Sequence, residues 1–235
     1  MAAPRAALVA LGDAQLYAND LALLGSERAW LNDSVVHFWQ QWLAGAAGAA
    51  GAGPVAEMLP PAAAFSLQFL DTDELLAGSE DNVLRRLAQL RLLLVPLVDG
   101  ADADEGGGEH WSLLAWQPRA QPAFYLVDSG AGALAQRPSQ AALATAAALG
   151  GLLGLPPGVP VRVVKGCPQQ GNGHDCGVFL CANAEALLGL LRERGDSQDL
   201  AAVGPLLPTS AAVRGKRAEM LAVALSLRRD LPAPR

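Results

Sequence analysis

Cys176 is the first residue whose type and position suggest chemistry. It follows a glycine-bearing loop, QQGNGHD, and begins a long apolar stretch, CGVFLCANAEALLGLLRER, that predicts a helix over Cys176 to Arg194. Backbone N–H groups and the helix dipole favour a thiolate at such a position. The alternative is a structural cysteine, because free cysteine is among the most buried residue types, with Asp175 as the helix N-cap. We interpret Cys176 as a candidate nucleophile.

A base for that nucleophile is predicted in a β-hairpin. Two β-prone runs, HWSLLAW from His110 and AFYLVDS from Ala123, flank the turn QPRAQP. A turn centred on Arg119 would place His110 opposite Asp128, since both lie equally far from it. A carboxylate beside an imidazole fixes its tautomer and stabilises the imidazolium. The alternative for Asp128 is a turn-forming role at the end of a strand.

The loop before Cys176 also offers donors for a developing oxyanion. The backbone N–H of Cys176 lies at the predicted helix start, and a glutamine side chain can supply a second donor. We favour Gln170 for this role, and Gln169 is its competitor. His174 is an alternative base, but no carboxylate follows it at an obvious spacing, so we interpret it as a loop residue.

The elements that must position these residues are short helices and strands. Helices are predicted over Leu31–Leu43 with Asn32 or Asp33 as N-cap, over Phe65–Leu76, Asn82–Leu90, Pro138–Gly150 and Ala211–Arg228, and strands over Arg91–Val98 and Val161–Val164. The Gly/Ala/Pro-rich stretch near 44–64 is interpreted as a low-complexity insertion, either a loop or a frayed helix end. Residues 99–109, rich in acids and glycine, are predicted to form a mobile loop.

Composition excludes several classes of protein. The 235 residues fit one domain, 1–235, and 51% hydrophobic residues with 5% aromatics rule out wholesale disorder. A formal net charge of −6 argues against a nucleic-acid partner. No apolar run is long enough for a bilayer span or a secretory signal. The three cysteines have no C-x-x-C spacing, so we expect free thiols in an intracellular protein and no metal.

Taken together, the motifs are specific. HWSL, FYLVDS and PQQGNGHDCG follow one another in that order, preceded by WLND at residues 30–33. This arrangement resembles the ubiquitin-like-protein-specific cysteine proteases, the sentrin/SUMO protease family, and most closely its deneddylating branch. The resemblance implies an α+β, papain-like fold with a small mixed β-sheet flanked by helices. It also implies four catalytic roles: His110 as general base, Asp128 as its orienter, Gln170 as oxyanion-hole donor and Cys176 as nucleophile.

The resemblance further implies how substrate is bound. Trp30 and Trp111 would wall a narrow tunnel for a Gly-Gly tail, and Asp33 would contact the modifier near that tail. Indole walls that leave room only for backbone select glycine by exclusion. The expected partner is the neddylation modifier, with SUMO second and ubiquitin third, and the net negative charge suits a modifier with a basic face.

The remaining expectations concern cofactors, assembly, location and alternative functions. They are a monomer without cofactor, located in the cytoplasm, the nucleus or both. A modifier-binding module without catalysis and an acetyl-transferring relative of this fold are the alternatives.

Overall fold

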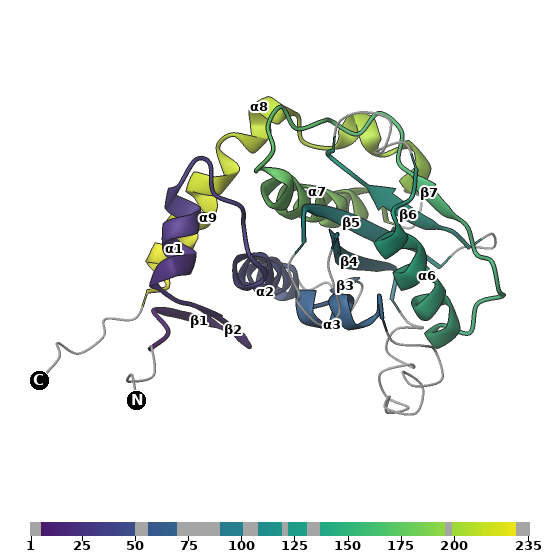
Figure 1. Ribbon diagram of the computed structural model, residues 1–235, viewed down its shortest axis with the longest axis horizontal. Coiled ribbons are helices and arrows are strands. Elements are labelled where there is room, and N and C mark those ends of the chain that lie inside the picture. The colour runs from purple at the N-terminus through teal and green to yellow at the C-terminus, as the bar shows by residue number, and fades with distance from the viewer. Residues whose placement is uncertain are drawn as a thin grey trace, which may run out of the picture.

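The computed structural model describes residues 6–49, 56–69, 90–100, 108–118, 122–130, 137–195 and 199–228. Its centre is a five-stranded mixed sheet of order β3-β4-β5-β6-β7, in which the two outer pairs are parallel and the two inner pairs antiparallel (Figure 1). The mixed sheet predicted from the sequence is therefore confirmed. The strands are β3 (Ala56–Met58), β4 (Leu92–Asp99), β5 (His110–Trp116), β6 (Phe124–Val127) and β7 (Val161–Val163).

Helices cover both faces of this sheet, and the side chains of each strand alternate between them. On one face α2 (Asp33–Ala49) and α7 (Cys176–Arg194) pack against residues such as Leu94 and Leu113. On the other face α3 (Pro61–Ser66) and α6 (Gln140–Leu152) pack against neighbours such as Leu93 and Leu114. The near-continuous apolar run of β4 follows from this double burial, because both of its faces are covered.

The hairpin register differs from the predicted one. Leu113 pairs with Val127 and Trp116 with Phe124, so continuing the register places His110 opposite Gly130 rather than opposite Asp128. The prediction that these two residues are directly opposed was wrong because the turn is not centred on Arg119. A displacement of two residues keeps every side chain on the same face of the sheet. His110 and Asp128 consequently remain diagonal neighbours that long side chains can join.

Two further predictions need correction. In the stretch near 44–64, α2 continues to Ala49, in agreement with the alternative of a helix end, but β3, which pairs in parallel with β4, and α3, which begins at Pro61, were not predicted. Pro at the first helical position is favourable because its missing N–H would have no intrahelical partner. The single C-terminal helix is instead α8 (Ser210–Val213) and α9 (Lys216–Ser226), with a turn between them.

Other predictions fall on parts of the chain outside the described residues. The predicted helix Asn82–Leu90 lies there except for Leu90, and so do residues 70–76 of the helix predicted over Phe65–Leu76. The greater part of the acidic loop predicted over 99–109 also lies there, at 101–107, as does Arg119.

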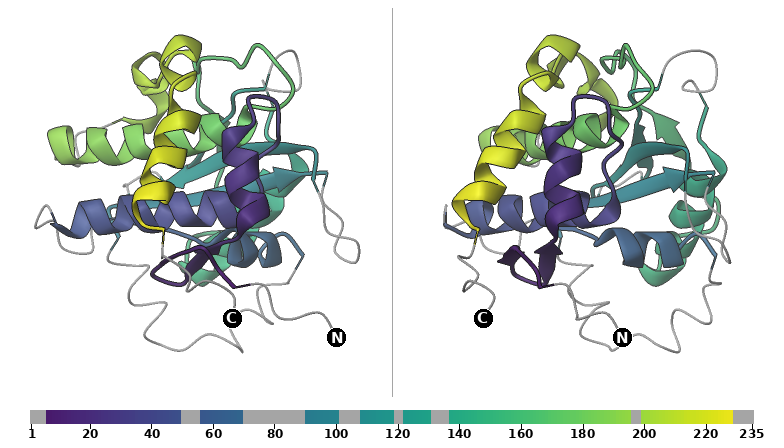
Figure 2. Two further views of the ribbon diagram at one scale, coloured as in Figure 1. Left: turned by 90° about the vertical axis from the view of Figure 1, so that its left-hand side faces the viewer. Right: turned by 60° about the vertical axis from the view of Figure 1, so that its left-hand side comes forward.

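The N-terminal part of the chain packs beside the C-terminal part. A two-stranded hairpin, β1 (Val9–Leu11) and β2 (Ala14–Leu16), lies against α2, and α1 (Ala18–Gly25) runs alongside α9 at the same edge of the molecule (Figure 2). The remaining described elements are the short 3-10 helices η3 (Leu200–Ala202) and η4 (Gly204–Leu206). No helix in the described ranges is long and apolar enough to cross a membrane.

Candidate active site

His110 and Asp128 form a short side-chain pair at the open end of the β5–β6 hairpin. Nε2 of His110 lies 2.6 Å from Oδ1 of Asp128. The same carboxylate oxygen accepts the backbone N–H of Gly130 at 2.7 Å. A Cβ on Gly130 would come within 3.2 Å of the imidazole Nε2 and 3.1 Å of Oδ1, so a glycine at this position lets the chain approach the pair closely.

The imidazole of His110 has a second partner, the side chain of Cys176. Because Asp128 engages Nε2, Nδ1 is the nitrogen that remains for the sulfur. The hydrogen bond that the ring donates to Asp128, followed by the one it shares with Cys176, raises the pKa of His110 to about 10, although partial burial opposes the shift. The ring is therefore held as an imidazolium at neutral pH. The structure thus brings together the three residues that the sequence proposed as nucleophile, base and orienter.

Cys176 lies at the first position of α7, as predicted, and its residue surface is only 1% exposed. The next residue packs tightly: a Cβ on Gly177 would lie 3.0 Å from the Leu31 Cβ and 3.2 Å from the Trp111 Cδ1. Asp175 occupies the N-cap position, but its side chain makes no capping hydrogen bond, contrary to the alternative weighed from the sequence. The side chain of Asp175 therefore leaves the first N–H groups of α7 uncapped, where an anion can be bound.

The two glutamines before Cys176 have different partners. Gln169 donates through Nε2 to the carbonyl groups of Asp128 and Cys167, at 3.2 and 2.9 Å. Gln170 accepts the Ser129 hydroxyl at 2.9 Å and donates through Nε2 to the Asn172 carbonyl at 2.6 Å. Gln169 is thus tied to the segment that carries the orienting carboxylate. An oxyanion role for Gln170 stays a prediction.

A groove of about 570 Å³ leads to the His110 side of this cluster. Its lining includes Trp30, Asp33 and Trp111, the three residues proposed from the sequence for substrate binding, together with Phe65 of α3. Trp30 is 43% exposed, whereas Trp111 is buried and donates its indole N–H to the Leu31 carbonyl at 2.9 Å. Trp111 is therefore a fixed wall, and Trp30 is the indole that solvent and a ligand can reach.

Asp33 lies in the first turn of α2, where a carboxylate is favoured by the helix dipole. Asn32, rather than Asp33, caps this helix, because its Oδ1 accepts the backbone N–H of Val35 at 3.1 Å. Asp33 thus remains at the groove with its carboxylate exposed. The surrounding protein partly desolvates that carboxylate and raises the pKa of Asp33.

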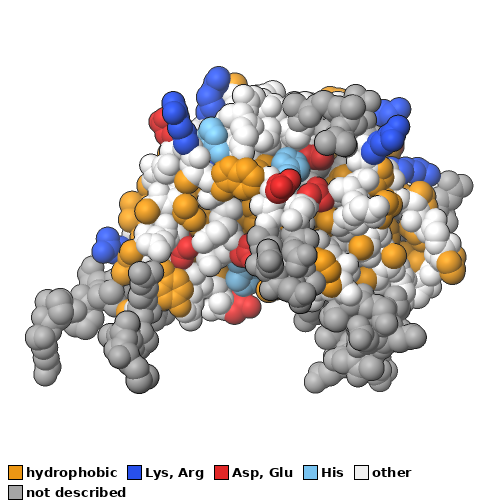
Figure 3. All heavy atoms as spheres, in the orientation of Figure 1, with side chains coloured by type: hydrophobic (Ala, Val, Ile, Leu, Met, Phe, Trp, Pro, Cys, Tyr) orange, Lys and Arg blue, Asp and Glu red, His pale blue; other side chains and the backbone are white. Residues whose placement is uncertain are grey.

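Asp99 is a further acid at the site that sequence reasoning assigned only to a loop. It is the last residue of β4 and the ladder partner of His110. Burial raises the pKa of its carboxyl group, while a hydrogen bond with Ser139 and the charge of His110 oppose the rise. Acidic side chains gather around a histidine on the face shown in Figure 3. The apolar run ending at Asp99 was the signal for its position, but only the β4–β5 register pairs it with His110.

No three His, Cys, Asp or Glu side chains in the described ranges are grouped so that they could hold a metal ion. The chemistry open to the cluster is that of a cysteine side chain next to an imidazole that a carboxylate orients, which is the arrangement required for acyl transfer through a covalent intermediate.

Comparisons with known proteins agree with this arrangement. Residues 156–201, which include Gln170 and Cys176, match the model of the Ulp1 protease family, C-terminal catalytic domain. The chain is 28% identical to "Probable sentrin-specific protease 8" of Dictyostelium discoideum over 200 residues, 81% of this chain and 78% of that one. It is also 28% identical to NEDD8-specific protease 1 of Arabidopsis thaliana over 176 residues, 74% and 72% of the two chains.

Among solved structures, the chain resembles the C-terminal Ulp1 protease domain in complex with Smt3, the yeast orthologue of SUMO. The TM-score is 0.63 at 15% identity, covering 96% of this chain and 89% of that one. This likeness establishes the fold, which is the α+β protease fold expected from the sequence.

Proposed function

The chain belongs to the Ulp1 family of cysteine peptidases, and on that premise we propose that it cleaves after the C-terminal Gly-Gly of the neddylation modifier. Members of this family are proteases that act on ubiquitin-like proteins, and this chain is a protease of the same kind. The finer assignment draws on the two curated relatives, one named as a sentrin-specific protease 8 and the other as a NEDD8-specific protease.

The observation that carries the proposal is the position of His110, between the carboxylate of Asp128 and the sulfur of Cys176. In the proposed reaction the thiolate attacks the carbonyl carbon of the terminal glycine and forms a C–S bond. The bond from that carbon to the leaving nitrogen then breaks, and the imidazolium of His110 gives its proton to the leaving amine. Water next attacks the thioester carbon and gives one proton to His110, the C–S bond breaks to release the thiolate, and the modifier's new carboxylic acid loses its remaining proton to solvent.

The groove supports a substrate whose tail carries no side chains. Cys176 is almost wholly buried, and the glycine that follows it packs closely against the indole of Trp111, which also lines the groove. Trp30 supplies an exposed indole at the same groove, and Asp33 supplies a carboxylate for a basic group near the tail. A tail of consecutive glycines suits such a site, because it brings no side chains to a buried thiol beside a fixed indole.

The central test is the variant Cys176→Ala. Cleavage of a modifier precursor or of a lysine-linked conjugate should fall by at least about 10⁴-fold, because no other group can form the thioester. The variant should still bind the modifier, since the groove is unchanged, and isothermal titration can measure that binding. Turnover equal to that of the wild type would overturn the assignment.

A second experiment discriminates between modifiers and between classes of function. Probes of the neddylation modifier, SUMO and ubiquitin, each with a C-terminal electrophile, are incubated in parallel with the protein. We expect Cys176 to react fastest with the first probe. Preferential reaction with the SUMO probe would show a SUMO-specific protease instead. Binding without reaction at any thiol would indicate a modifier-binding module. Dependence on an acetyl donor with little hydrolysis would indicate an acyltransferase.

A further inference from the structure

Arg217 is a buried charged residue that the reaction does not use. It lies in α9, near the end of the chain, and is only 7% exposed. A buried guanidinium is costly unless its donors are satisfied by partners of matching geometry. Its partners therefore show which parts of the molecule this residue holds together.

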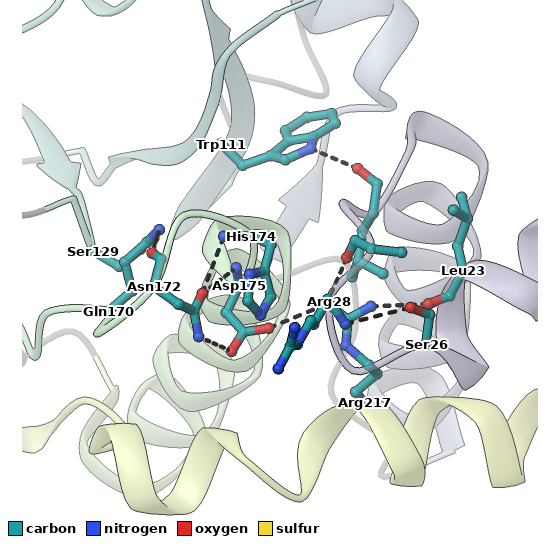
Figure 4. A network of polar contacts seen from close by, with 12 residues as sticks. Leu23, Ser26, Arg28, Trp111, Ser129, Gln170, Asn172, His174, Asp175 and Arg217 are labelled. Carbon is teal, nitrogen blue, oxygen red and sulfur yellow. Dashed lines mark hydrogen bonds and ion pairs between the residues drawn. The ribbon is translucent and has the colours of Figure 1, made fainter.

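Those partners lie in two separate parts of the chain, one that leads from α1 to the groove and one that directly precedes α7 (Figure 4). Nη1 donates to the carbonyl of Leu23 and Nη2 to the carbonyl of Ala29, both at 2.9 Å. Ala29 directly precedes Trp30, the exposed wall of the groove. Nη2 also lies 3.1 Å from Oδ1 of Asp175, the residue before the nucleophile. One guanidinium thus joins the groove wall to the start of α7.

The contact with Asp175 extends to the remainder of the nucleophile loop. Oδ2 of Asp175 accepts the side-chain amide of Asn172 at 2.8 Å, and Oδ1 of Asn172 accepts the backbone N–H groups of His174 and Asp175, both at 3.0 Å. The carbonyl of Asn172 in turn accepts the amide of Gln170. The Asp175 carboxylate therefore does not cap α7. It links Arg217 to Asn172, whose hydrogen bonds hold this loop together.

We propose that Arg217 is a positioning residue that couples the substrate groove to the nucleophile, by fixing the backbone at Ala29, next to Trp30, and by pairing with the carboxylate of Asp175, the residue before Cys176. This inference rests on the proposed function for its substrate. The Asp175 carboxylate belongs to the residue next to the nucleophile, so an unpaired negative charge there would disfavour negative charge on the sulfur, and the ion pair with Arg217 at 3.1 Å offsets it. The two backbone contacts act independently on the groove, because they do not involve Asp175.

The experiment separates these two actions with Arg217→Ala, the double variant Arg217→Ala/Asp175→Asn, and Arg214→Ala as matched control. Arg214 is an exposed arginine at the end of α8 that also lies near Asp175. Iodoacetamide alkylation of Cys176, located by peptide mass spectrometry so that Cys167 and Cys181 are counted separately, reports on the thiol without substrate. KM and kcat for modifier cleavage report on the groove and on the chemistry.

Arg217→Ala should slow alkylation of Cys176 about tenfold and raise KM by a similar factor. The double variant should regain the wild-type rate of alkylation, because the carboxylate that Arg217→Ala leaves unpaired has been removed. Its KM should stay raised, because the two backbone contacts of Arg217 are still absent. Alkylation and KM equal to those of Arg214→Ala in a folded Arg217→Ala protein would overturn the inference. So would a double variant in which both quantities recover or neither does.

If Arg217→Ala does not fold, as judged by its thermal melting curve, Arg217→Lys replaces it. A single ammonium group cannot bind both carbonyls and the carboxylate as the guanidinium group does. We therefore expect slower alkylation of Cys176 and a raised KM, each by less than in Arg217→Ala. Wild-type values for this variant would contradict the inference. If the wild-type protein cleaves no modifier, the proposed function fails, and the alkylation arm still decides whether Arg217 acts on the nucleophile.

Discussion

Two histidine–aspartate pairs in this protein are both within hydrogen-bond distance through Nε2 and Oδ1, but their surroundings differ. In one, Nε2 of His37 in α2 lies 2.9 Å from Oδ1 of Asp13, and in the other, Nε2 of His110 lies 2.6 Å from Oδ1 of Asp128. The side chain of Asp13 is 71% exposed, whereas that of Asp128 is 10% exposed. The carboxylate of the first pair is therefore solvated by water, and that of the second by the protein.

The second nitrogen of each ring completes the contrast. Nδ1 of His37 is buried and has no hydrogen-bond partner among the described residues, while the second side of the His110 ring faces the sulfur of Cys176. Distance between a carboxylate and an imidazole is thus a poor guide to function. A desolvated carboxylate on one side of the ring and a nucleophile on the other make the difference.

Replacement of Asp128 by asparagine should give the largest effect among the histidine partners. Asparagine keeps the shape of the side chain but cannot stabilise the imidazolium or impose the same tautomer, so kcat/KM for modifier cleavage should fall by about 10²- to 10⁴-fold. Steady-state kinetics at neutral pH measure this loss. Asp13→Asn is the matched control, and an equal loss in both variants would contradict the distinction between the pairs.

The pH dependence should change in a defined direction. Asp128 and Cys176 raise the pKa of His110 from its ordinary 6.5 to about 10, so the wild-type enzyme should keep its imidazolium, and its alkaline limb of kcat/KM should lie far above pH 6.5. In Asp128→Asn that limb should move toward lower pH. Profiles between about pH 6 and about pH 11 test this, and coincident limbs would refute the assignment of His110.

The same raised pKa affects stability. Because the folded state binds the His110 proton more tightly than the unfolded state, the stabilisation is complete below pH 6.5 and is lost as pH rises toward about 10. Thermal melting of the wild type and of His110→Gln should therefore converge in alkaline solution. A difference between them that grows with pH would contradict the direction of the shift.

The smallest effect is expected for Asp13→Asn. An exposed ion pair contributes about 1 kcal/mol or less to the free energy of unfolding, so chemical denaturation should show only a minor change. Modifier cleavage should remain within about twofold of wild type, since neither His37 nor Asp13 lies at the groove. A loss comparable with that of Asp128→Asn would show that the exposed pair is also functional.

Several elements could be predicted from the sequence because local pattern decides them. The strand His110–Trp116 and the helix Cys176–Arg194 have the predicted bounds, since each combines a clear apolar pattern with a glycine-bearing loop beside it. The division of the C-terminal helix into α8 and α9 was not predicted. The break falls at Arg214 and Gly215, and no proline there marks the end of a helix. The strand β3 was missed because three residues beside a Gly/Ala-rich stretch form a strand only by pairing with β4.

The candidate site divides in the same way. Residue types and the order of the motifs singled out His110, Asp128 and Cys176, because a nucleophile, a base and an orienter each need particular side-chain chemistry. The sequence could not show that Asp99 is the ladder partner of His110, since that depends on the register between β4 and β5. It also could not show that the side chain of Asp175, at the N-cap position, pairs with Arg217, 42 residues later, instead of capping α7.

The sequence by itself determined which groups can do chemistry here and which segments form helices and strands. The tertiary structure decided which groups meet, which carboxylate loses its water and which charge is neutralised. The physical reason is that side-chain chemistry and local periodicity are properties of neighbouring residues. Desolvation and pairing depend instead on segments that only the folded chain brings together, as Arg217 is brought to Ala29 across 188 residues.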